Sequence, residues 1–209
     1  MKKLHNTTKN IPTRDEAIEL LWPYLPKIGD CIRRGWQAWE DFGNLSPELR
    51  RPLNATARAS FVHCHIAEAA KRTFKGIPGV LLSQRKRGYL QVVFNEVIVL
   101  RFKKLNSNYH PGGIKTNQYK LFMSQSQLSF KGFELVQANL VGGYRLDHLQ
   151  REISDVCVVC PEGSKNQWRF EIAATTTPKD IMFENESNES TAIVRAKGVE
   201  RKGRKTSGE

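Results

Sequence analysis

The stretch YLQVVFNEVIVLRFKKL, Tyr89 to Leu105, decides the fold class of this chain. Two apolar runs rich in Val, Leu and Phe flank Asn95-Glu96, so the stretch predicts a β-hairpin with a tight turn. Just upstream, GVLLS (79–83) predicts a short strand and RKRG (85–88) a turn. Short apolar strands separated by turns thus predict that a sheet starts near residue 80.

The residues before this sheet predict helices. Thr13 is a suitable N-cap for RDEAIELLW, with acidic residues in the first turn. IGDCIRRGWQAWEDF (28–42) carries an apolar stripe at helical spacing, and 44–47 is expected to be a loop. A third helix is predicted from about Asn54 to Phe74, followed by Gly76.

The residues after the hairpin predict further strands. QYKLFM (118–123) suits a short helix or a strand, and this choice stays open. One or two strands are predicted over 133–146, one over 153–160, a turn at PEGSKN and a closing strand at WRFEIA. Short turns favour antiparallel pairing. We therefore expect an α+β domain over 1–174, with N-terminal helices (about 13–74) packed on a mainly antiparallel twisted sheet (about 80–173) and a flexible charged tail over 175–209.

Composition indicates an ordinary globular protein. The 209 residues are 39% hydrophobic and 26% charged. No apolar run approaches the roughly 20 residues that span a bilayer, and MKKLHNTTKN has no apolar stretch typical of a signal peptide. We expect a cytoplasmic protein with reduced cysteines, no membrane segment and no cofactor.

The positive charge is concentrated in one third of the chain. The net charge is +12, and residues 51–120 contain thirteen Lys and Arg against two Asp and Glu. Such grouping favours a polyanion or an acidic protein as partner. The alternative is a solvated basic surface, because residues clustered in sequence need not cluster in space.

The predicted strand at 97–105 places its cations on both faces. Arg101 and Lys103 share one face, while Phe102 and Lys104 share the other. With the neighbouring turn and the Gly-rich loop, the candidate binding residues are Arg85, Lys86, Arg87, Arg101, Lys103, Lys104 and Lys115. Phosphates need such groups, and the interleaved tyrosines suit stacking on bases. A charged edge strand that discourages aggregation is the alternative.

Arg58 and His63 are the candidate catalytic residues. Their R-x4-H spacing on a predicted helix resembles the motif of HEPN-type RNases, in which His is the general base and Arg steadies the phosphate. Two features depart from that family, namely Ala59 where a polar residue is usual and the many strands predicted here. An ordinary helix surface is the alternative.

No metal site is expected. Cys157 and Cys160 have CxxC spacing, but residues three apart on a strand face opposite sides and no second CxxC is present. His63 and His65 are two positions apart on a predicted helix and therefore point away from each other, so they cannot easily bind the same metal ion. Asp155 and Glu171 lie on adjacent predicted strands, as the carboxylates of some metal nucleases do. However, the lysine that follows the second carboxylate in that nuclease pattern is absent after Glu171.

Four segments resemble a known group of bacterial proteins: GIPGV (76–80), LRFKKL (100–105), GYRLD (143–147) and ISDVCVVCPEG with Trp168. Members are encoded beside a gene for an Xre-type helix-turn-helix protein fused to a metallopeptidase-like domain. The resemblance implies the toxin of a toxin–antitoxin or phage-defence module, held inactive by an antitoxin-like protein from the neighbouring gene. It supplies no catalytic residues. A non-catalytic regulator that binds RNA or DNA is the alternative, and both enzymatic activity and oligomeric state stay open.

Overall fold

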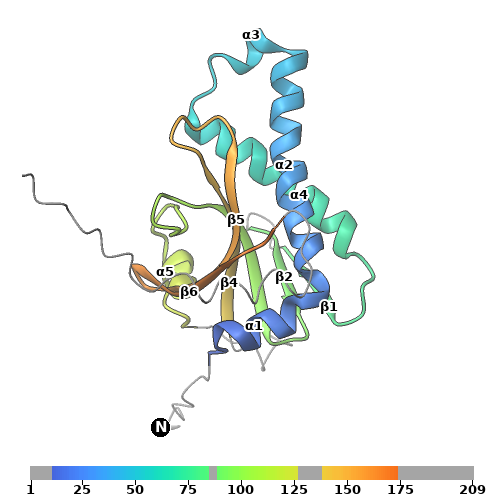
Figure 1. Cartoon of the computed structure of the whole chain (residues 1–209), viewed down its shortest axis with the longest axis vertical. Coiled ribbons are helices and arrows are strands. Elements are labelled where there is room, and N and C mark those ends of the chain that lie inside the picture. Colours follow the sequence, from blue (N-terminus) through green and yellow to red (C-terminus); the bar gives the residue numbers. More distant parts are fainter. Residues whose placement is uncertain (1–10, 85–88, 127–137, 174–209) are drawn as a thin grey trace, which may run out of the picture.

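The structure is a computed structural model that describes residues 11–84, 89–126 and 138–173. Its helices are α1 (Arg14–Leu21), the 3-10 helix η1 (Trp22–Tyr24), α2 (Leu25–Leu45), α3 (Pro47–Arg50), α4 (Ala55–Phe74) and α5 (Asn117–Met123). Its strands are β1 (Val80–Ser83), β2 (Gln91–Phe94), β3 (Ile98–Lys104), β4 (Ala138–Leu146), β5 (Ile153–Glu162) and β6 (Lys165–Glu171). The expected α+β class is confirmed (Figure 1). None of the described helices is both long and apolar enough to cross a membrane.

The six strands form one sheet in the order β1-β2-β3-β4-β5-β6. Every neighbouring pair is antiparallel except β3 and β4, which run parallel with Phe102 opposite Gly142. Parallel neighbours cannot be joined by a tight turn. The chain between them accordingly passes through a loop and α5. The sheet is thus mostly antiparallel as expected, with one parallel pair at its centre.

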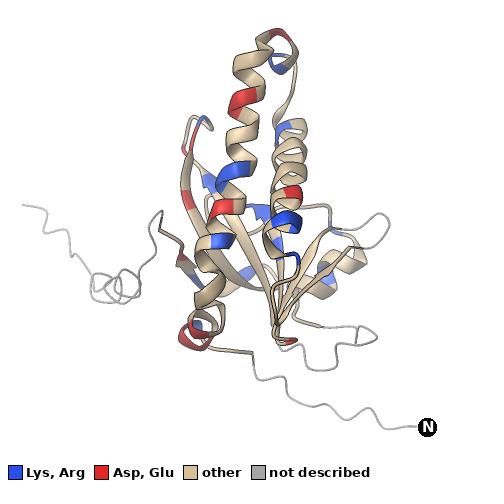
Figure 2. Ribbon diagram, turned by 90° about the vertical axis from the view of Figure 1, so that its right-hand side faces the viewer, with Lys and Arg blue, Asp and Glu red and all other residues tan. Residues whose placement is uncertain are grey.

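Helices α2 and α4 cover one face of the sheet. They form a hairpin that projects beyond the strands and carries α3 at its turn (Figure 1). The main core lies between these helices and the sheet, and Trp36 of α2 meets Tyr144 of β4 with ring centroids 6.1 Å apart. Gly35 lets the two helices approach, since a Cβ there would lie 3.0 Å from the carbonyl oxygen of Val62. The charged residues of α2 and α4 are spread along both helices (Figure 2), whereas β1 and β2 contain none.

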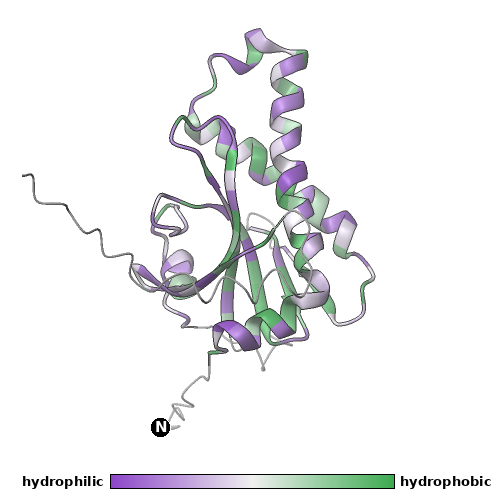
Figure 3. Ribbon diagram, in the orientation of Figure 1, coloured by the Kyte–Doolittle hydropathy of each residue, from purple (hydrophilic) through white to green (hydrophobic). Residues whose placement is uncertain are grey.

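Helix α5 covers part of the opposite face. A second, smaller core there joins Val99, Val141 and Val159 of the sheet to Phe122 and Met123 of α5. Because both faces are covered, the central strands are hydrophobic along much of their length, as Figure 3 shows. The segment that the sequence left undecided is therefore helical.

Several local signals act as the sequence predicts. Thr13 caps α1 in a capping box, in which its backbone N–H donates to the Glu16 carboxylate at 2.8 Å. Asn95 and Glu96 both have positive φ, the geometry of a type I′ hairpin turn, so the predicted hairpin is confirmed.

Three details differ from the prediction. The helix expected over 28–42 extends from Leu25 to Leu45, and α3 begins at Pro47, the last residue of the expected loop. The turn expected over PEGSKN is shorter, because β5 extends to Glu162 and β6 begins at Lys165. The turn at 85–88 and the tail at 175–209 lie outside the described residues.

Candidate functional site

A cleft of about 840 Å³ opens where β3 ends. Its walls are the first half of α4, the loop after β3 and the turn between β4 and β5. We call it the basic cleft. Its lining residues are Ala55, Thr56, Ala59, Ser60, His63, Tyr89, Lys103, Lys104, Leu105, Asn106, Ser107, Gly112, Gly113, Ile114, Arg145, Leu146, Asp147, His148 and Gln150.

Lys103 and Lys104, the last residues of β3, reach this cleft from opposite faces of the sheet. The Nζ of Lys103 lies 3.5 Å from the ring centroid of Tyr89, a cation–π contact. The Nζ of Lys104 donates to the side-chain oxygen of Gln150 at 3.0 Å. Lys103 and Lys104 therefore lie on opposite faces of β3, as predicted. Both ammonium groups nevertheless line the basic cleft, because β3 ends at this cleft.

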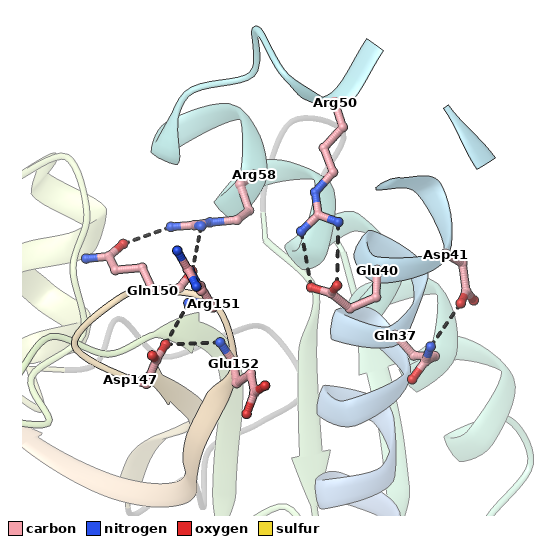
Figure 4. Close-up of polar contacts among 9 residues, drawn as sticks. All are labelled: Gln37, Glu40, Asp41, Arg50, Arg58, Asp147, Gln150, Arg151 and Glu152. Atoms are coloured by element: carbon pink, nitrogen blue, oxygen red, sulfur yellow. Dashed lines mark hydrogen bonds and ion pairs between the residues drawn. The ribbon is translucent and has the colours of Figure 1, made fainter. Parts of the chain in front are cut away.

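Arg58 lies beside Lys104. From α4, its guanidinium donates to the backbone oxygen and the side-chain oxygen of Gln150, both at 2.8 Å (Figure 4). Two cations therefore share one neutral acceptor. The pKa of Lys104 is lowered, first by burial and then by the charge of Arg58. Among the described residues, neither Arg58 nor Lys103 nor Lys104 forms an ion pair with a carboxylate.

Asp147 is an acidic residue in the lining, and its oxygens bind the backbone. They accept the backbone N–H groups of Arg151 at 2.6 Å and Glu152 at 3.0 Å (Figure 4). They also accept the N–H of Leu149 at 3.2 Å. The hydrogen bond from Glu152 is the largest cause of the lowered pKa of Asp147. This carboxylate shapes the turn that presents Gln150 to Arg58.

His63 is partly buried in the same wall. Its pKa is lowered to about 4, first by burial and then by the charge of Lys103, while a hydrogen bond with the Phe102 backbone acts in the opposite direction. Its ring meets Tyr89 edge-on at 5.2 Å between centroids. His63 is therefore a neutral imidazole at neutral pH, so it adds a polar group to the cleft without adding charge.

The structure brings some of the predicted site residues together and separates others. His63, Lys103 and Lys104 line the basic cleft, and Arg58 is bonded to its wall. Arg101 does not line the basic cleft, but it lines a smaller adjoining hollow together with Lys103 and Tyr89. It is 9% exposed under α5, its guanidinium is 4.0 Å from the Phe122 ring centroid, and it also faces the side chain of Gln91.

The remaining predicted cations are not part of the cleft as described. Lys115 is exposed on the loop before α5, outside the lining residues. Arg85, Lys86 and Arg87 lie outside the described residues. Gln150 is the candidate site residue that sequence reasoning missed, because a lone glutamine in a polar turn carries no pattern that indicates its contacts with Arg58 and Lys104.

The other candidate motifs have structural roles. Cys157 and Cys160 are buried in different cores on opposite faces of β5, as their spacing predicted, and burial raises the pKa of each thiol to about 12. Asp155 accepts a hydrogen bond from Arg145. Glu171 lies opposite Cys157 across the β5–β6 pair. Among the described residues, no group of three or more His, Cys, Asp or Glu is placed to hold a metal ion.

No family model matches the chain, and comparisons with curated proteins and with solved structures found no match.

Proposed function

We propose that the basic cleft binds nucleic acid through its phosphate groups. The observation that carries this proposal is the arrangement of Arg58 and Lys104 around one side-chain oxygen of Gln150, with Lys103 in the same cleft. Among the described residues, no carboxylate forms an ion pair with either cation. Burial lowers the pKa of Lys104 most, and repulsion by Arg58 lowers it further. A bound phosphate would relieve that repulsion and accept hydrogen bonds from both.

Nucleic acid is favoured over an acidic protein by the other groups in the cleft. Tyr89 is 47% exposed and stands beside Lys103, so a ring suited to stacking on a base adjoins a cation suited to a phosphate. His63 is uncharged at neutral pH and can hydrogen-bond a base or a sugar.

The experiment that tests this proposal is a salt titration of binding. Lys104→Gln should weaken binding to RNA or DNA and reduce the slope of log affinity against log salt by about 1, because one fewer counterion is displaced. Lys75→Gln, at the opposite end of α4, is the matched control and should leave the slope unchanged. Equal slopes for both variants would remove the basic cleft from the binding site.

The biological role that we propose follows the resemblance: a toxin-like component whose cleft is covered by an antitoxin-like partner. A regulator that binds nucleic acid without harm to the cell is the alternative. Inducible expression of the chain alone separates the two. Growth arrest that is relieved by the neighbouring gene supports a toxin, whereas harmless expression with salt-sensitive binding supports a regulator.

A ribonuclease is a second candidate function, since Arg58 and His63 lie at one cleft with two lysines. Yet an imidazole with a pKa of about 4 is a weak base at neutral pH, because a general base works best with a pKa near the working pH. Binding is therefore the function that the geometry favours. RNA cleavage that is lost in His63→Ala would restore the catalytic hypothesis, and cleavage unchanged in that variant would exclude His63.

A further inference from the structure

A second hollow lies on the other side of the loop that borders the basic cleft. It has a volume of about 500 Å³, and we call it the polar groove. Its lining includes Lys165, Asn166, Trp168 and Arg169 of β6. The described residues that line it include two cations, Lys165 and Arg169, and one histidine, and none of them is Asp or Glu. Like the basic cleft, it therefore offers positive charge.

The two hollows are adjacent, because Asn106 lines both of them. Asn106 also fixes the loop that divides them, since its side-chain oxygen accepts the backbone N–H groups of Asn108 and His110, each at 2.9 Å. His110 in turn contacts the backbone oxygen of Gly163 at 3.2 Å, which ties the loop to the β5–β6 turn. The cleft and the groove thus hold a fixed position relative to each other.

The polar groups of the groove suit the backbone of a nucleic acid. Arg169 lies over the ring of Tyr109 at 3.9 Å, which orients an exposed guanidinium. The side-chain oxygen of Asn166 is buried and accepts no hydrogen bond from the described residues, while its nitrogen donates to the Tyr109 backbone. Because that oxygen is enclosed by protein atoms, the groove's exposed cations, Lys165 and Arg169, are the groups that a nucleic acid can contact there.

The apolar side chains at the basic cleft favour single strands over duplexes. Ile114 in its lining is 84% exposed, Tyr89 is 47% exposed and Leu149 in the adjoining turn is 55% exposed. Bases of a duplex are stacked inside the helix and present only their edges, whereas bases of a single strand can pack on such surfaces. The lysines are also partly buried, so a phosphate must enter the cleft to reach them.

We propose that one single strand of nucleic acid passes from the basic cleft over Asn106 into the polar groove. Its phosphates would contact Lys103 and Lys104 at one end and Lys165 and Arg169 at the other. A base would pack on Tyr89. This inference rests on the proposed function and adds both the class of nucleic acid and a second subsite.

Binding of fluorescent oligonucleotides of about 4 and about 16 nucleotides, which span the usual site sizes for single strands, tests the inference. Wild-type protein should bind the longer strand more tightly than the shorter strand and than a duplex of the same sequence. Lys165→Gln with Arg169→Gln should weaken binding of the long strand more than binding of the short strand, because only the long strand fills both subsites at once. Tyr89→Ala should weaken both by at least about fivefold, the lower end of one lost stacking contact.

The outcomes distinguish this inference from the function on which it rests. If the double variant binds the long strand as tightly as wild type, or if the duplex binds as tightly as the single strand, the inference fails while the basic cleft remains a binding site. If wild type binds no oligonucleotide at low salt, both fail. Lys165→Gln alone, which leaves the Arg169–Tyr109 contact in place, is the second variant if the double variant is misfolded.

Discussion

The partly buried imidazole of His63 predicts a specific dependence of stability on pH. The unfolded chain protonates this group near its ordinary pKa of 6.5, whereas the folded chain holds the pKa near 4. Between these values the unfolded state binds more protons, so stability falls as the pH falls through this window. Above the window the contribution is fully present, and below it the contribution is lost.

The magnitude follows from the size of the shift. A depression from 6.5 to about 4 corresponds to about 3 kcal/mol over the whole window. Of this, about 2 kcal/mol should disappear between pH of about 7 and about 5. Asp147 and Asp155, whose pKa values are lowered from 3.8, lose their contributions only at lower pH, so they do not interfere with this interval.

Urea denaturation of wild type and His63→Gln at the two pH values measures this effect. Glutamine keeps a hydrogen-bonding group but does not titrate, so the variant should lose about 2 kcal/mol less than wild type over the interval. A constant loss of stability in the variant cancels in this comparison. His65→Gln is the matched control, because this exposed histidine on the same helix lies over Phe61 and not in the cleft. If wild type and His63→Gln change equally, the proposed environment of His63 is wrong.

Three further predictions follow from the same structure. Gly35→Ala should lower the free energy of unfolding by about 1–3 kcal/mol in urea, because its Cβ would lie 3.0 Å from the backbone N of Ile66; no change would mean that α2 and α4 separate easily. Arg101→Gln should lower the free energy of unfolding by about 1–3 kcal/mol, because the contact of a buried guanidinium with the Phe122 ring is lost. Unchanged stability would show that Arg101 is not held against Phe122. Inorganic polyphosphate should raise the pKa of His63 in an NMR titration, because an anion in the basic cleft offsets the positive charge of Lys103. An unchanged pKa would argue against anion binding beside His63.

Local patterns allowed most of the fold to be predicted from the sequence. The cap at Thr13, the helical stripe of α2 and the alternation around Asn95-Glu96 each depend on residues a few positions apart. The parallel pairing of β3 and β4 depends on residues far apart in the chain, and short turns elsewhere favoured the antiparallel alternative. Helix α5 is too short for its period to distinguish it from a strand.

The candidate site was predicted in separate parts. Arg58 and His63 on a helix, and Lys103 and Lys104 on a strand, were each suggested by local spacing. Nothing in the sequence indicates that these elements meet at one cleft. The burial of Arg101 escaped prediction because it depends on α5, whose helical state the sequence left open.

The parallel pair also has a consequence for how the molecule forms. The strands β1 to β3 and β4 to β6 are each joined by short connections, so each set can assemble from local contacts. Joining the two sets requires closure of the long connection between Lys104 and Ala138, which costs more entropy than either set of turns. Lys104 belongs to the first set and Gln150 to the second. We therefore expect a refolding chain to acquire its hairpins early and its affinity for ligand only at the final docking step.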